Sequence, residues 1–79
     1  MKTYYSIEEA LNGVTAGEIT WERLLELKDI YDDAYKVSAE YGYVGVGCIT
    51  WANRALHEYQ GMPTEEIEVP VLYTDEDFA

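Results

Sequence analysis

Basic residues are scarce in this 79-residue chain. Five lysines and arginines stand against sixteen aspartates and glutamates, which gives a formal net charge of −11. Proteins that bind nucleic acids or anionic membranes use Lys and Arg to neutralise phosphates, so we expect no direct contact with either. The charge instead predicts a basic partner, such as the Lys- and Arg-rich surface of another protein.

Cysteine and histidine each occur once, as Cys48 and His57. One cysteine cannot form an internal disulfide, and one Cys with one His falls short of a zinc site. On the helix expected over residues 47–60, Cys48 lies on the apolar face and His57 on the polar face, so they should point apart. We therefore expect Cys48 in the core, His57 on the surface, and no catalytic, metal-binding or cofactor-binding residue.

Long apolar runs are also absent. No stretch approaches the about 18 residues that cross a bilayer, and the N-terminus lacks a signal-peptide pattern. With the single cysteine, this predicts a soluble protein of the reducing cytoplasm. Hydrophobic residues make up 48% of the chain, too many for a disordered acidic tail. We expect one domain over residues 1–79, monomeric, with a loose acidic tail at residues 74–79.

Three segments carry helix signals. Ser6-Ile7-Glu8-Glu9 has the form of a capping box, and Gly13 is placed to end a helix over residues 7–12. The longest periodic segment predicts a helix from residues 18–20 to Tyr41, followed by Gly42. A third helix is expected from about residue 47 to residue 60, before Gly61 and Pro63.

Two segments favour extended structure. Apolar and other residues alternate over 67–73, the pattern of a half-buried strand, and Pro70 restricts that strand to a sheet edge. Residues 3–5 predict either an edge strand or a loop packed on the core. Residues 43–49 contain glycines and leave open a strand or the approach to a helix. The expected fold class is α+β, with two to three helices packed on a small antiparallel sheet or an edge strand.

The long helix is predicted to have two faces. Its apolar arc, at about 100° per residue, faces the core and contains Leu24, Leu27, Ile30, Tyr31, Ala34, Tyr35 and Tyr41. Opposite lies a row of acids that we name the acidic stripe: Glu18, Glu22, Glu26, Asp29, Asp33 and Glu40. Like charges one turn apart destabilise a helix, and only Arg23, near Glu26, and Lys36, near Asp33, are placed to offset the repulsion.

A second acidic row is expected near the C-terminus, made of Glu65, Glu66, Glu68, Asp75, Glu76 and Asp77. The stripe alone places a carboxylate about every 5–6 Å, whereas a DNA strand has a phosphate about every 3.4 Å. An imitation of DNA therefore needs both rows. Trp21 and Trp51 lie at the edges of their apolar faces, where each is a candidate aromatic anchor for a protein interface.

In length, acidity, aromatic-rich composition and acid-lined helix, the whole chain resembles the small acidic anti-CRISPR proteins of phages, and is most similar to inhibitors of a type I-C Cascade complex. No diagnostic motif carries the resemblance, and it assigns no role to any residue. It implies a non-enzymatic inhibitor without a cofactor, acting in the bacterial host cytoplasm, that occupies the surface where Cascade would hold DNA.

Two other interpretations stay open. The chain is alternatively a small interaction module, such as an antitoxin or a phage adaptor, that binds through Trp21, Trp51 and exposed tyrosines. The acidic surface would then serve only solubility, which is the ordinary role of surface charge.

Overall fold

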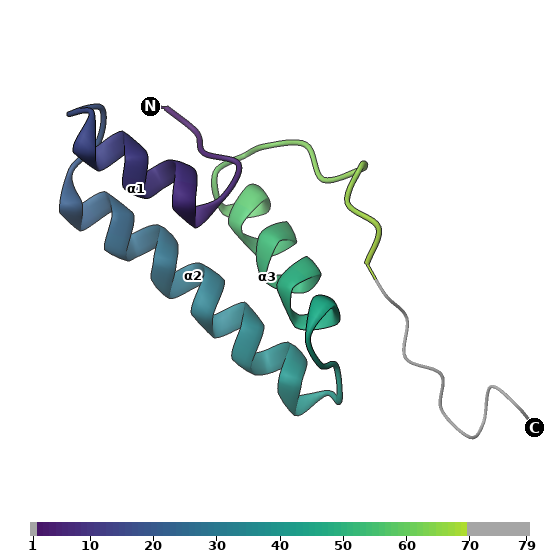
Figure 1. The fold of residues 1–79 in the computed structure, drawn as a ribbon. Helices are drawn as coiled ribbons and strands as arrows, with labels where there is room; N and C mark the ends of the chain where they lie inside the picture. Colours follow the sequence, from purple (N-terminus) through teal and green to yellow (C-terminus); the bar gives the residue numbers. More distant parts are fainter. Residues whose placement is uncertain (1, 70–79) are drawn as a thin grey trace, which may run out of the picture.

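The computed structural model describes residues 2–69, which form three helices (Figure 1). Helix α1 spans Ile7–Thr15, α2 spans Trp21–Glu40 and α3 spans Val46–Tyr59. Both α1 and α3 pack against α2, the longest of the three. Within the described range, no helix is both long and apolar enough to cross a membrane.

This architecture corrects the predicted α+β fold, because residues 2–69 contain no strand. The backbone of residues 3–5 bonds to side chains instead. The Gln60 amide oxygen accepts from Tyr4 N at 2.7 Å, and its nitrogen donates to Tyr4 O at 2.9 Å. His57 Nε2 donates to Tyr5 O at 2.8 Å. Since these backbone groups are satisfied by α3 and its C-cap, the segment needs no neighbouring strand.

The strand predicted over 67–73 is also wrong in its described part. Residues 67–69 form no strand, and Ile67 N closes a turn by donating to Thr64 O at 3.0 Å. An alternating sequence shows that a segment can bury one face, but it does not supply a partner strand. Residues 70–73 and the predicted tail at 74–79 lie outside the described residues.

The three predicted helices are confirmed, with shifts at their ends. Thr20 caps α2, its hydroxyl oxygen accepting from Arg23 N at 3.1 Å, so the helix begins slightly later than residues 18–20. For residues 43–49 the sequence left open a strand or the approach to a helix. They begin as a loop and enter α3 at Val46. Gly45 has φ +56°, a conformation that favours glycine, and it allows this abrupt entry.

Gly13 does not end α1 but lies within it, buried against Tyr4. A Cβ at this position would lie 2.6 Å from Tyr4 Oη and 2.7 Å from the ring. The missing side chain therefore lets the buried tyrosine pack directly on the helix. Glycine is commonly a helix-ending signal, but here close packing explains it.

The core is small and lies against one side of the N-terminal half of α2. Its buried members come from all three helices and the N-terminal segment: Tyr4, Ala10, Leu24, Leu27 and Leu56. The predicted apolar arc of α2 is correct there but wrong at the other end, where Tyr35 is 38% exposed and Tyr41 is 74% exposed. Since α1 covers only the first half of α2, the second half keeps part of its apolar arc uncovered.

Cys48 is buried, as predicted, but His57 is only 1% exposed, so its predicted surface position is wrong. The His57 ring packs edge-on against the Tyr5 ring, 4.5 Å between centroids. A polar side chain can be buried when it has a hydrogen-bond partner, and the Tyr5 carbonyl supplies one. The histidine therefore joins the N-terminal segment to α3.

We predict that Gly13→Ala destabilises the protein by about 1–3 kcal/mol, because the new methyl group overpacks against Tyr4. The sign of this change in unfolding free energy is informative, because helix propensity alone predicts the opposite sign. Inside a helix, alanine is favoured over glycine by about 1 kcal/mol. Urea unfolding followed by circular dichroism measures the change. In a Tyr4→Leu background, the same substitution should lose most of its cost; an equal cost in both backgrounds would contradict the packing explanation.

Candidate functional site

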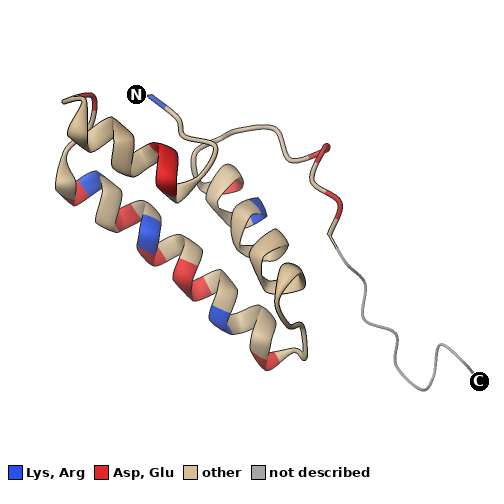
Figure 2. Ribbon diagram, in the orientation of Figure 1, with Lys and Arg blue, Asp and Glu red and all other residues tan. Residues whose placement is uncertain are grey.

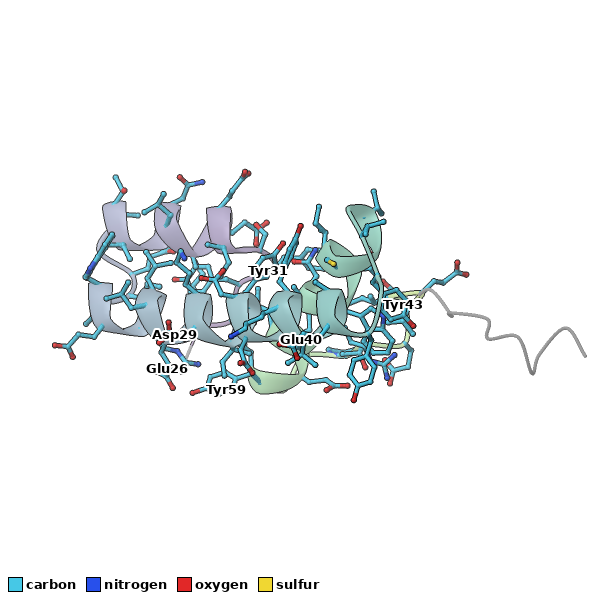
Figure 3. All side chains as sticks on the ribbon, turned by 90° about the horizontal axis from the view of Figure 1, so that it is seen from below. Glu26, Asp29, Tyr31, Glu40, Tyr43 and Tyr59 are labelled. Carbon is cyan, nitrogen blue, oxygen red and sulfur yellow. The ribbon has the colours of Figure 1, made fainter. Side chains whose placement is uncertain are left out.

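The acidic stripe occupies the side of α2 away from α1. Figure 2 shows acidic residues recurring along α2, and Figure 3 shows Glu26 and Asp29 on the side opposite α1. All six predicted stripe residues are exposed. Glu18 precedes the helix, which begins at Trp21, so only five of them belong to α2.

Glu18 is neutralised by the N-terminal segment. Lys2 Nζ lies 2.5 Å from Glu18 Oε1, and Tyr4 Oη donates to Glu18 Oε2 at 3.3 Å. The hydrogen bond from Lys2 lowers the pKa of the Glu18 carboxyl, because it favours the ionised form. This carboxylate therefore fixes residues 2–4 beside the α1–α2 loop and is poorly placed to bind a partner.

Glu26 is also engaged within the molecule. Arg23 forms an ion pair with it at 3.1 Å, one turn away on α2. The hydroxyl of Tyr59, on α3, donates to the same carboxylate, and the Arg23 guanidinium lies 5.4 Å from the Tyr59 ring centroid. Glu26 thus contributes to the contact between α2 and α3.

The other four stripe carboxylates have no such partner among residues 2–69: Glu22, Asp29, Asp33 and Glu40. All five lysines and arginines of the chain fall within the described residues, and none lies within ion-pairing distance of these four. Contrary to the expectation from the sequence, Lys36 forms no ion pair with Asp33. Lys28 pairs with Asp32 at 2.5 Å on the neighbouring flank.

Glu40 is placed where the helix itself disfavours it. It is the last residue of α2, and no basic residue lies in that last turn. The partial negative charge at a helix C-terminus repels an anion by a few tenths of a kcal/mol to about 1 kcal/mol. The Glu40 carboxylate therefore lowers the stability of the free protein, and an external cation would relieve this cost.

The described part of the second acidic row, at residues 65–68, does not adjoin the stripe. Glu65, Glu66 and Glu68 are exposed, but Figure 2 shows their segment on the far side of α3 from α2. Asp75, Glu76 and Asp77 lie outside the described residues. Within residues 2–69 the acidic surface is thus a single line of charge, without the second line that an imitation of duplex DNA requires.

An apolar groove of about 680 Å³ lies between the C-terminal half of α2 and α3. Its walls come from both helices and the loop between them: Ala34, Val37 and Ser38 on α2, its C-cap Tyr41, Tyr43 in the loop, and Trp51, Arg54, Ala55 and Glu58 on α3. Small side chains at three wall positions hold the helices close and leave the space open above them. This groove was not predicted from the sequence, although those small residues among aromatics were a visible signal.

Trp51 forms one wall of the groove. Its ring lies 5.8 Å from the Tyr43 ring, centroid to centroid, and 6.0 Å from the Arg54 guanidinium. Arg54 is itself paired with Glu58 at 3.2 Å, so the groove carries no unpaired cation. Trp21, the other predicted anchor, is 56% exposed at the opposite end of α2. The two tryptophans therefore do not form one patch.

Comparison with protein-family models, with curated proteins and with solved structures finds no match. Within residues 2–69, no group of three or more His, Cys, Asp or Glu side chains is arranged to hold a metal ion. The features that distinguish the surface are the four unpaired carboxylates and the aromatic groove beside them.

We predict that Lys2→Ala raises the pKa of Glu18, because the hydrogen bond that favours the carboxylate is lost. In the wild type, this pair stabilises the fold above the unfolded-state pKa of glutamate, and the contribution disappears as pH falls through the lowered folded-state pKa. A pH titration of the Glu18 carboxyl carbon by NMR measures the shift. Lys28→Ala removes an equal charge elsewhere and should leave Glu18 unchanged; an equal response to both would refute the specific pair.

Proposed function

We propose that this protein is a non-enzymatic inhibitor of the anti-CRISPR type, which binds the DNA-binding surface of a complex such as type I-C Cascade. The observation that carries this proposal is the row of unpaired carboxylates on the exposed side of α2. A basic groove that holds DNA offers the lysines and arginines that this row lacks. Binding would satisfy both sides by removing like-charge repulsion from each.

The row resembles the charge of DNA more than its shape. From Glu22 to Glu40, α2 rises about 27 Å, at about 1.5 Å per residue. Four carboxylates over this length are sparser than phosphates on a DNA strand. We therefore propose that the protein enters a basic groove by electrostatic attraction and blocks it sterically, rather than matching each phosphate contact. It would act as a monomer in the bacterial cytoplasm, without a cofactor.

A second candidate function is supported by the groove. In that case the protein is an interaction module, such as an antitoxin or a phage adaptor, that binds an apolar segment through Trp51 and its neighbours. Salt separates the two functions, because attachment by exposed charges weakens as ionic strength rises, whereas apolar burial depends on it little.

We predict that reversing the four unpaired stripe carboxylates abolishes inhibition. The variant carries Glu22→Lys, Asp29→Lys, Asp33→Lys and Glu40→Lys. Attraction to a basic groove becomes repulsion, so affinity should fall on the order of a hundredfold at low salt. The measurement is displacement of a target DNA duplex from purified type I-C Cascade, followed by gel shift at low and at physiological salt.

The matched control changes net charge by the same amount at four exposed acids outside the stripe. It carries Glu8→Lys, Glu65→Lys, Glu66→Lys and Glu68→Lys, all at exposed positions. Since the stripe remains intact, this control should retain most of its inhibition. Equal loss in both variants would show that total charge, not the α2 row, is responsible. Full inhibition by the stripe variant would remove the row from the mechanism.

A further inference from the structure

The uncovered half of α2 brings the groove and the acidic stripe together. Val37 forms part of the groove wall, and its helix neighbours one turn away are Asp33 and Glu40. Both carboxylates are exposed and lack ion pairs with any lysine or arginine. One edge of the apolar groove is therefore lined with negative charge.

We infer that this groove binds a basic amphipathic helix of the partner, which inserts two large apolar side chains and places Lys or Arg against the acidic edge. The inference rests on the proposed function, because it names the element of the partner that the same face engages. An amphipathic helix in an apolar groove is a common mode of peptide recognition, with anchor residues three or four positions apart.

The size of the groove limits what it can hold. One wall runs from Ala34 on α2 to the C-cap Tyr41, and the other from Trp51 to Glu58 on α3. Each wall spans about 10 Å, which is two turns of helix at about 1.5 Å per residue. Its volume of about 680 Å³ is within the range of about 300–1,000 Å³ of pockets that hold compact ligands. Two apolar side chains one turn apart match this length.

Charge favours a basic occupant of the groove over two other candidate occupants, a second copy of the chain and the chain's own C-terminal residues. A second copy of the chain carries a net charge of −11 and would meet the stripe with like charge. The chain's own C-terminal residues include Asp75, Glu76 and Asp77, which the same carboxylates would repel. Arg54 does not offset this repulsion, because it is already paired with Glu58 in the groove wall.

Trp51 provides a direct measurement of binding. The chain contains two tryptophans, so a Trp21→Phe variant reports only on the groove. The probe is a synthetic helical peptide with leucines at i and i+4 and lysines on the adjoining face. We expect a saturable shift of Trp51 emission on titration. A peptide of equal charge with serine in place of both leucines should not produce this shift, and its binding should be at least tenfold weaker.

The groove variant for this test is Val37→Ser with Tyr41→Ser, at two sites that are 40% and 74% exposed and outside the core. It should weaken binding of the leucine peptide at least tenfold. The matched control is Val44→Ser, since Val44 is 83% exposed and does not line the groove. Circular dichroism establishes that both variants keep their helices. Unchanged peptide binding by a folded groove variant would overturn the inference.

Two further outcomes would also overturn it. If Trp51 emission changes with protein concentration alone, the groove binds a second copy. If Leu72→Ser with Tyr73→Ser shifts Trp51 emission without peptide, the chain's own C-terminal segment covers it. The proposed function is tested separately. If the groove variant still inhibits Cascade and the stripe-reversal variant does not, the proposed function stands and only peptide binding in the groove is ruled out. Inhibition that survives stripe reversal defeats the function, whatever the peptide does.

Discussion

Burial of Leu24, Leu27 and Leu56 in one small core holds the three helices together despite a net charge of −11. Each buried leucine contributes about 1.5–3 kcal/mol, whereas a like-charge pair one turn apart on a helix costs only a few tenths of a kcal/mol. The core can therefore support a helix whose other side is unfavourably charged. Because these leucines fix which side of α2 faces inward, they also fix which side presents the carboxylates to solvent.

The position of the core explains the rest of the surface. It uses the first half of α2, where α1 and the N-terminal segment add Ala10 and Tyr4. Among residues 2–69, the second half lies beside α3 and the loop before it, and the groove opens there beside Trp51. Charge and apolar surface thus adjoin on one side of the molecule. A partner with basic and apolar groups would satisfy both, which makes this side the most informative place to test binding.

The long helix and its acidic side were predictable, since both follow from the spacing of residues along a single helix. The loop conformation of residues 3–5 could not be chosen over an edge strand, because the sequence does not show that the Gln60 side chain, 56 positions away from Tyr4, takes the place of a neighbouring strand. His57 was placed wrongly for a similar reason: a helical wheel treats a polar residue as exposed, while the Tyr5 carbonyl allows it to be buried. The groove depends on how far α1 covers α2, and periodicity contains no information about that length.

The proposed function depends on carboxylates of α2 that pair with no lysine or arginine in the free protein. The most direct test compares urea unfolding of the wild type with that of the near-isosteric variant Asp29→Asn, Asp33→Asn, Glu40→Gln, whose helix propensities are similar. At low salt the variant should be more stable, and the difference should shrink as salt screens the repulsion. A variant of equal or lower stability at low salt would show that these carboxylates are already satisfied within the fold.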